Sequence, residues 1–277
     1  MNKIKLFSLL IPCLLILISG TAVSATTIYV SDDYLTIQEA INGASSGDTV
    51  VVRDGTYTEN VVVNKDHLTV ESENGAPVTI IEAVAINDSV FTINTDYVTI
   101  QGFTAKRGCS GIYLIDADYC SIFDNITSSN SDKGIYLVRS SSNTLNGNTA
   151  SDNSYGISLV YSSNNNLIYN TASDNSNDGI YLATSSDSNT LNGNTASDNS
   201  YGISLVYSSN NRIWFNNFTA NHSNIFLVGS TNTVLSSAEE ITYTYNSNTY
   251  ISHLGNYWDN YTGEDADNNG IGDTPYT

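Results

Sequence analysis

The middle of the chain carries a repeated pattern of apolar and polar residues. A Gly-Ile-(Tyr/Ser)-Leu segment begins at five glycines spaced by 22 or 23 residues: Gly111, Gly134, Gly156, Gly179 and Gly202. Each repeat holds two short runs in which apolar and polar residues alternate, and clusters of Ser, Asn, Gly and Asp separate these runs. Alternation with a period of two is typical of strands, whereas the i, i+3, i+4 spacing of a helix is missing. The repeats also lack the Leu-x-x-Leu-x-Leu signature of leucine-rich repeats.

Units of about 23 residues can bury their apolar side chains only by stacking on one another. Stacking places Ile on Ile and Leu on Leu in two interior columns: Ile112, Ile135, Ile157, Ile180 and Ile203, with Leu114, Leu137, Leu159, Leu182 and Leu205. The sequence therefore predicts an all-β parallel β-solenoid, with roughly eight coils between Thr49 and Leu235. Two coils are nearly copied, because Gly134–Tyr155 matches Gly179–Tyr201.

Asparagines recur in three rows with the same spacing as the repeat. The rows are Asn125, Asn148, Asn170, Asn194 and Asn216; Asn130, Asn153, Asn175, Asn199 and Asn221; and Asn143, Asn165, Asn189 and Asn211, headed by Cys120. At a turn that recurs in every coil, a side-chain amide can bond to the coils on both sides, and Asn tolerates the left-handed backbone that such turns require. We expect structural ladders. Cys120 is then a buried, inert thiol, although a disulfide with Cys109 stays open in an oxidising compartment.

The N-terminal segment has the pattern of a signal peptide over residues 1–25. Lys3 and Lys5 precede an apolar run from Leu6 to Ile18, and small residues follow up to Ala25. No later apolar run reaches the roughly 18 residues of a membrane span, so we expect no transmembrane segment after cleavage. These features predict a secreted or cell-surface protein.

A short helix is predicted at Thr36–Gly43. Thr36 and Glu39 form a capping box, Ile37, Ala40 and Ile41 share one face, and Gly43 provides the stop. Because a solenoid needs its open end covered, we expect this helix to cap the first coil. The predicted organisation is a signal peptide at 1–25, an N-terminal cap at 26–48, repeats at 49–235 and a C-terminal cap at 236–277.

The charge of the chain excludes one class of partner. Its 28 acidic and 9 basic residues give a net charge of −19. Because phosphate contacts need a basic stripe, nucleic acid is not an expected partner.

The two ends of the chain also carry a family resemblance. Thr36-Ile-Gln-Glu-Ala-Ile, followed by Gly47-Asp-Thr-Val and Asp54-Gly-Thr-Tyr, resembles the start of pectin-lyase-like proteins. The repeats and the ending (255–261 and 265–276) resemble NosD-like domains, also described as carbohydrate-binding and sugar-hydrolase domains, of archaeal surface proteins. The resemblance implies a right-handed single-stranded parallel β-helix with a short N-terminal capping helix. Its implied function is that of an exported, non-catalytic module that binds carbohydrate or another cell-envelope component.

A calcium loop is predicted in the C-terminal cap. Asp265, Asp267, Asn269, Ile271 and Asp273 occupy alternating positions, as do the oxygen ligands of calcium loops, with Ile271 at the place of a backbone carbonyl ligand. Tyr276 replaces the bidentate Glu, so we expect weak, structural calcium binding that holds Tyr257 and Trp258 against the last coil.

Copper is not expected as a cofactor. Its sites use His, Cys and Met, and after the signal peptide the chain has no Met and three scattered histidines, His67, His222 and His253.

Sugar contacts are predicted at outward tyrosines. Tyr113, Tyr136 and Tyr181 lie between the buried Ile and Leu of their strands, and exposed rings in a row can stack on sugars, although cross-strand packing is the competing interpretation.

The alternative function is a polysaccharide lyase or glycoside hydrolase that acts on acidic glycans. Its candidate residues are Asp116 and Asp118, predicted on one face of a strand, with Arg139 one coil further on. A cross-coil ion pair is the competing interpretation of these three residues.

Overall fold

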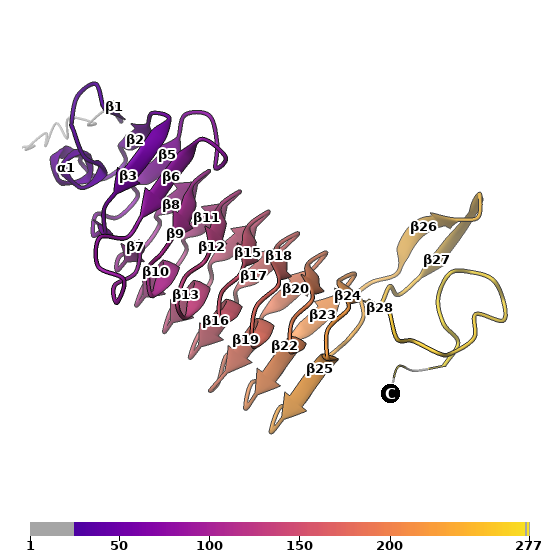
Figure 1. Cartoon of the computed structure of the whole chain (residues 1–277). Helices are drawn as coiled ribbons and strands as arrows, with labels where there is room; N and C mark the ends of the chain where they lie inside the picture. The colour runs from indigo at the N-terminus through magenta and orange to yellow at the C-terminus, as the bar shows by residue number, and fades with distance from the viewer. Residues whose placement is uncertain (1–24, 275, 277) are drawn as a thin grey trace, which may run out of the picture.

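The computed structural model describes residues 25–274 and 276 as a parallel β-solenoid closed by one short helix (Figure 1). The predicted signal peptide, apart from Ala25, lies outside the described residues. Three parallel sheets run the length of the solenoid, and a hairpin follows near the C-terminal end. The predicted all-β parallel β-helix is therefore confirmed. In the described residues no helix has the length and apolar character needed to cross a membrane.

The three sheets, named A, B and C here, each contribute one strand to a coil. Sheet A contains β1 (Thr27–Val30), β2 (Thr49–Val52), β5 (Thr69–Ser72), β8 (Thr99–Gln101), β11 (Ser121–Phe123), β14 (Thr144–Asn146), β17 (Asn166–Ile168), β20 (Thr190–Asn192) and β23 (Arg212–Trp214). Sheet B contains β3 (Gly55–Thr58), β6 (Thr79–Glu82), β9 (Thr104–Lys106), β12 (Ile126–Ser128), β15 (Thr149–Ser151), β18 (Thr171–Ser173), β21 (Thr195–Ser197), β24 (Asn217–Thr219) and β28 (Tyr257–Trp258). Sheet C contains β4 (Val61–Val63), β7 (Phe91–Ile93), β10 (Ser110–Ile115), β13 (Lys133–Val138), β16 (Tyr155–Val160), β19 (Asp178–Ala183), β22 (Tyr201–Val206) and β25 (Ser223–Val228). Outside these sheets lie α1 (Ile37–Gly43) and the antiparallel hairpin of β26 (Ile241–Tyr245) and β27 (Asn248–Ser252).

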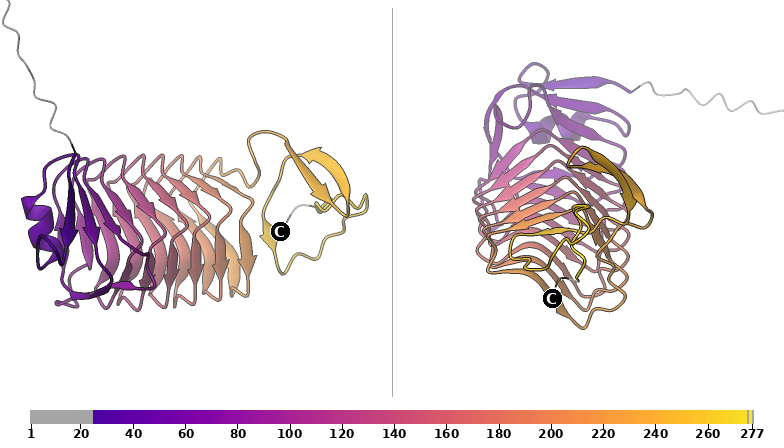
Figure 2. Two further views of the ribbon diagram at one scale, coloured as in Figure 1. Left: turned by 90° about the horizontal axis from the view of Figure 1, so that it is seen from above. Right: turned by 90° about the vertical axis from the view of Figure 1, so that its right-hand side faces the viewer.

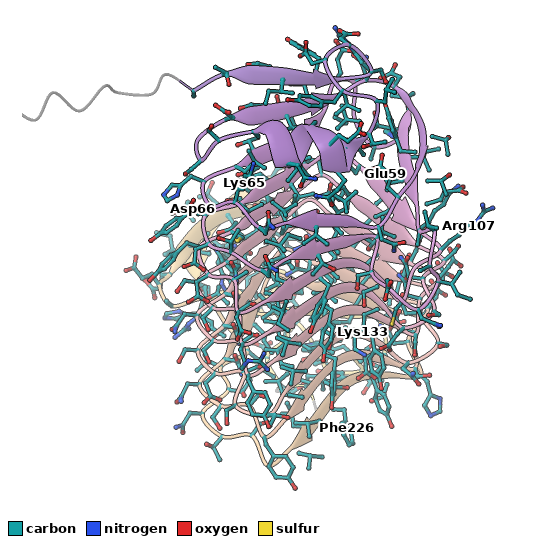
Figure 3. The ribbon with its side chains drawn as sticks, turned by 90° about the vertical axis from the view of Figure 1, so that its left-hand side faces the viewer. Glu59, Lys65, Asp66, Arg107, Lys133 and Phe226 are labelled. Atoms are coloured by element: carbon teal, nitrogen blue, oxygen red, sulfur yellow. The ribbon has the colours of Figure 1, made fainter. Side chains whose placement is uncertain are left out.

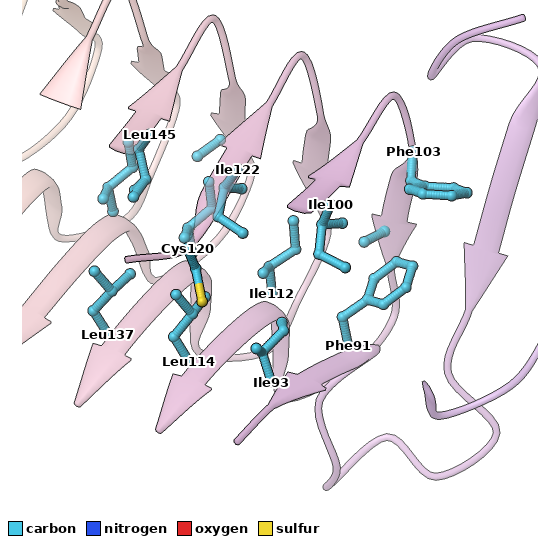
Figure 4. Packing of buried hydrophobic residues seen from close by; sticks show 14 of the residues in the cluster. Phe91, Ile93, Ile100, Phe103, Ile112, Leu114, Cys120, Ile122, Leu137 and Leu145 are labelled. Carbon is cyan, nitrogen blue, oxygen red and sulfur yellow. The ribbon is translucent and has the colours of Figure 1, made fainter. Parts of the chain in front are cut away.

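The interior columns form as predicted. Ile135 pairs with Ile112 and Ile157, and Leu137 pairs with Leu114 and Leu159, so identical side chains stack along sheet C. These side chains are fully buried, and Figure 4 shows part of this packing. A register shift of one residue would turn the Ile and Leu columns outward, so burial fixes the register.

Each coil has three strands, whereas the alternating runs predicted two. The additional strand belongs to sheet B and reads Thr-Ala-Ser in β15, β18 and β21. Its single inward residue is a small Ala, such as Ala150, so the run carries little hydrophobic signal. The predicted eight coils lie within residues 49–235, and β1 and β28 extend sheets A and B beyond that range.

The predicted capping helix covers the first coil. Thr36 Oγ1 accepts a hydrogen bond from the backbone N of Glu39 at 3.1 Å, and Ile37, Ala40 and Ile41 are fully buried. The carboxylate of Glu59 accepts hydrogen bonds from the backbone N of the first two helical residues, both at 3.0 Å (Figure 3). A negative charge there also stabilises the helix dipole.

The asparagine rows form buried ladders between coils. Asn170 Nδ2 donates to the carbonyl of Leu145 at 2.9 Å and to Asn194 Oδ1 at 3.0 Å, while Asn170 Oδ1 accepts from the backbone N of Asn148 at 3.0 Å. Asn170 is 1% exposed. One Asn side chain thus satisfies two backbone groups of the adjacent coil that water cannot reach.

The left-handed backbone of these turns lies one residue before each ladder Asn. Tyr169, Gly193 and Phe215 have φ of 52°, 68° and 58°, whereas the Asn residues that follow them do not have positive φ. The prediction that Asn itself takes this conformation is therefore wrong. The Asn side chain is instead selected for its hydrogen bonds to the adjacent coils.

The last coil is covered by Trp258 but not by Tyr257. Trp258 is 8% exposed and stacks on Phe218, with ring centroids 4.6 Å apart, and Tyr276 stacks on its other side at 4.4 Å. Tyr257 is 60% exposed, so its predicted packing against the coil is wrong. Neighbouring residues of a strand face opposite sides, and Trp258 takes the inward position of β28.

Replacing Asn170 by Ala should lower the free energy of unfolding by about 1–3 kcal/mol, because the backbone N of Asn148 and the carbonyl of Leu145 lose partners they cannot replace with water. Denaturant unfolding of the parent and the variant measures this. Asn146→Ala is the matched control, since Asn146 occupies an outward position of β14. Equal losses for the two variants would contradict a structural role of the ladder.

Candidate functional site

The outer face of sheet C carries one aromatic side chain from each of six successive strands. This aromatic row consists of Tyr113, Tyr136, Tyr155, Tyr181, Tyr201 and Phe226. All six rings are at least partly exposed, and with strands about 4.8 Å apart the row is about 24 Å long. Figure 3 labels Phe226 at one end of the row and Lys133 near the other. The structure thus places the three predicted tyrosines in one row, and their binding to sugar stays a prediction.

The rings of the aromatic row are arranged in three pairs. The centroid distances are 5.2 Å for Tyr113 and Tyr136, 5.3 Å for Tyr155 and Tyr181, and 5.0 Å for Tyr201 and Phe226. The first pair is stacked, and the other two are tilted by 40° and 42°. Burial raises the pKa of the first four tyrosines, so their hydroxyls stay protonated near neutral pH and can donate hydrogen bonds.

An ammonium group occupies the junction between the first and second pairs. Lys133 Nζ lies 4.7 Å from the ring centroid of Tyr136 and 5.3 Å from that of Tyr155. The same ammonium forms an ion pair with Asp132. The face therefore binds a cation of its own chain by cation–π contacts and a carboxylate.

A carboxylate occupies the junction between the second and third pairs. Asp178 pairs with Tyr201 of β22, and the register of β16 and β19 places it beside Tyr155. Asp178 is 6% exposed, and burial raises its pKa to about 6. The hydroxyl of Ser204 is close enough to oppose this shift, yet neither it nor the buried hydroxyl of Ser158 makes a hydrogen bond of normal geometry within the described residues.

The three candidate residues of the lyase alternative do not converge. Arg139 binds Asp116 through two hydrogen bonds, at 2.6 and 2.8 Å, and this contact lowers the pKa of Asp116. Asp118 Oδ1 instead accepts from the backbone N of Ser141 at 2.6 Å. The cross-coil ion pair is therefore the correct interpretation.

The prediction that Asp116 and Asp118 share a strand face is wrong. β10 ends at Ile115, and Asp116 has a φ of 50°, which turns the chain out of the strand. The alternation of apolar and polar residues continues into this turn, and it misled the assignment.

The cysteines are free thiols in the structure. Cys120 is 1% exposed, and its burial raises its pKa to about 11. Its backbone N donates to Asn143 Oδ1 at 2.7 Å, so Cys120 heads the third ladder as predicted and is an inert thiol. The disulfide that the sequence left open is not formed.

In the described part of the chain, the His and Cys side chains that could bind copper do not lie together. His67 stacks on Tyr97, and His253 Nδ1 lies 3.1 Å from the carbonyl oxygen of Ser237. Within the described residues, the one group of three His, Cys, Asp or Glu side chains close enough to share a metal consists of Asp265, Asp267 and Asp273. This set consists of oxygen donors, which suit a hard cation and not copper.

The predicted calcium loop brings its three carboxylates together. Their ligand atoms lie within 4.8 Å of one another. Asp265 accepts from the backbone N of Asn269 and of Gly270, both at 2.9 Å, and Asp273 accepts from that of Ala266 at 2.6 Å. These bonds close the loop, and Gly270 takes a φ of 87° at its sharpest point. Asn269 Oδ1 is directed to the backbone N of Ile271, at 2.7 Å.

Two hollows on the surface carry acidic side chains. One has a volume of about 570 Å³ and is lined by Glu71, Glu73 and Asp124, among others. The second measures about 700 Å³ and lies along the turns that carry Asp152 and Asp198. Neither lining includes a Lys or Arg, so both hollows disfavour anionic ligands.

The sequence reasoning missed three members of the site, Tyr155, Asp178 and Tyr201. Each lies two residues before an interior Ile, so strict strand alternation would place it inward, and the alternating pattern does not mark it as part of the outer face. The sequence signal that remains is position, because each directly precedes a repeat Gly.

Comparison with known proteins agrees with this architecture. Residues 41–263 match the family described as periplasmic copper-binding protein (NosD). A cell surface glycoprotein of Methanothermus fervidus is 38% identical over 129 residues, which are 45% of this chain and 21% of the glycoprotein. The chain thus spans about a fifth of the length of this relative.

Solved structures share the fold at low sequence identity. Pectate lyase Pel9A has a TM-score of 0.60 at 15% identity over 76% of this chain and 79% of the lyase. The ORF18 protein of Geobacillus virus E2 has a TM-score of 0.59 at 14% identity over 80% of this chain and 68% of the viral protein. At such identities the likeness shows the fold alone. Because the family match covers most of the chain, the protein belongs to the NosD family of pectin-lyase-like parallel β-helix proteins.

Proposed function

We propose that the protein is an exported module of the cell surface that binds carbohydrate on the aromatic row of sheet C. Its exported location is supported by the signal-peptide pattern, by a family described as periplasmic and by a relative named as a cell surface glycoprotein. The observation that carries the binding function is the row itself, with one partly exposed ring on each of six successive strands.

The row supplies both kinds of contact that a sugar polymer needs. Aromatic faces pack against the apolar faces of sugar rings, and protonated tyrosine hydroxyls donate hydrogen bonds to sugar oxygens. The tilt of the second and third ring pairs leaves parts of their faces uncovered by their partners. A row of about 24 Å is long enough to contact several sugar units.

No observation favours a lyase acting on acidic glycans. Arg139 is neutralised by Asp116, and the surface hollows carry carboxylates without bases. Copper binding, which the description of the family names, does not fit the donors present.

We also propose that the loop from Asp265 to Asp273 binds calcium in a structural role. Three carboxylates within 4.8 Å in a chain of net charge −19 repel one another unless a cation lies among them. The loop is attached to the hairpin, because Tyr243 and Tyr250 donate to the carbonyls of Asn269 and Asn268 at 2.9 and 3.1 Å. Calcium would therefore stabilise the C-terminal cap.

The paired substitution Tyr113→Ala with Tyr181→Ala should weaken binding to the glycans that the parent selects on a glycan array. Each aromatic contact contributes about 0.5–1.5 kcal/mol, so the loss of two should reduce affinity roughly tenfold. The matched control is Tyr161→Ala with Tyr207→Ala, which removes two rings that are 54% and 65% exposed outside the row. A parent that selects no glycan, or a control that loses as much affinity, would refute the proposed function.

Calcium should raise the melting temperature of the parent, because a ligand that binds only the native state stabilises it in proportion to the logarithm of its concentration. Without the bidentate Glu, we expect an affinity of roughly 10⁻⁴ to 10⁻³ M. Thermal melts with excess calcium and with chelator provide the measurement. Asp265→Ala with Asp267→Ala should abolish the shift, and a shift that survives in this variant would show that calcium acts elsewhere.

A further inference from the structure

The described chain has two nearly buried carboxylates, and their surroundings are opposite. Asp48 is 4% exposed, and its oxygens accept hydrogen bonds from the backbone N of Ser45 and Thr26, at 2.7 and 2.8 Å. These bonds lower its pKa, so Asp48 is a satisfied structural group. Asp178 is 6% exposed and has neither an ion pair nor such a backbone donor among the described residues. A buried carboxylate whose nearest donor is one serine hydroxyl, that of Ser204, is costly, which marks Asp178 as a group with another role.

The duplicated coils supply a comparison within the molecule. Position 133 in the first copy corresponds to position 178 in the second, because each directly precedes the Gly-Ile-Tyr-Leu segment. Lys133 places its ammonium between the first and second ring pairs, over Tyr136 and Tyr155. At the next junction, the chain has a carboxylate where the first copy has a cation. The second junction therefore has aromatic walls and a negative charge, but no ammonium of its own.

We propose that the second junction binds a primary ammonium group carried by an amino sugar, with Asp178 as its counter-ion and Tyr155, Tyr181 and Tyr201 as its walls. This inference rests on the proposed carbohydrate-binding function and names the class of sugar. Aromatic rings attract an ammonium group by cation–π contacts, and a carboxylate shielded from water attracts it more strongly than an exposed one. The net charge of −19 and the acidic hollows also favour a cationic glycan.

The test uses two soluble probes, a β-1,4-linked hexamer of glucosamine and its fully N-acetylated counterpart, titrated into the purified protein by calorimetry at pH 7. We expect the amine hexamer to bind at least tenfold more tightly than the acetylated one. Asp178→Asn should weaken binding of the amine hexamer at least tenfold. Asp88→Asn is the matched control, because it removes one charge from an exposed turn outside the aromatic row and outside both acidic hollows, and it should change the affinity less than twofold.

A pH series separates this site from general attraction to an acidic protein. With a pKa of about 6, Asp178 is largely neutral at pH 5, while its neighbours Tyr155 and Tyr181 have raised pKa values and stay neutral throughout. The other charged groups near this face form ion pairs, Lys133 with Asp132 and Arg139 with Asp116. The amine hexamer is more protonated at pH 5 than at pH 7, so weaker binding at pH 5 would have to come from the protein. We expect this loss in the parent and not in Asp178→Asn.

The melting temperature checks that the variant is folded. Since burial disfavours the charged carboxylate, Asp178→Asn should melt no lower than the parent at pH 7.

Equal affinity of the parent and Asp178→Asn for the amine hexamer would overturn the inference. If the acetylated hexamer binds as tightly and without dependence on Asp178, the inference fails while the carbohydrate-binding function stands. If neither hexamer binds, the inference fails, and the glycan array decides the carbohydrate-binding function. Tetralysine, a peptide that carries ammonium groups, is a third probe. If it binds through Asp178 and the amine hexamer does not, the ligand is a protein and the amino-sugar inference fails.

Discussion

The hydrogen bonds from asparagine side chains to the turns of adjacent coils are the constraint on which this structure depends. A solenoid buries the backbone groups at its corners, where no strand is present to pair with them, and an unpaired buried N–H costs about as much as a lost hydrogen bond. Asn148 N, for example, is satisfied by Asn170 Oδ1 at 3.0 Å. Because the donor and acceptor belong to different coils, each bond also fixes how far the chain travels before it returns. The ladders therefore hold each corner of a coil against the next, and they do so for coils of 22 to 24 residues.

A fixed coil length converts distant sequence positions into rows of neighbours on the surface. Residues 22 to 24 apart stack at the strand spacing, so the aromatic row of sheet C and the carboxylates of the turns both follow from the register. The interior constrains only the inward positions. The outward positions can change without loss of the core, and in this way Lys133 and Asp178 take opposite charges at equivalent places of two nearly copied blocks.

A feature of this molecule could be predicted when the sequence of a single repeat contains the pattern that causes it. The Ile and Leu columns, the ladders and the helix at Ile37–Gly43 are each marked by a local pattern, and all were predictable. The third strand was not, because Ala150 and its equivalents give almost no hydrophobic signal. The left-handed residue before each ladder Asn varies among Asp, Ser, Asn, Gly, Ala, Tyr and Phe, so no single residue type marks it. The surroundings of Asp178 depend on rings from neighbouring coils, which no pattern within one repeat describes.

The placement of charge on this chain disfavours an acidic polymer as a ligand. A site for an acidic polymer needs basic groups that are free to meet it, and here Arg139 is bound to Asp116 while Lys133 is bound to Asp132. The unpaired charges that remain on the described surface are mainly carboxylates, most of them on exposed turns where water solvates them. Asp178 differs because it is buried between aromatic rings, where the effective dielectric is lower and a charge acts more strongly on its surroundings. The proposed ammonium ligand would contribute the positive charge that this junction lacks, since the chain supplies the carboxylate and the aromatic rings around it.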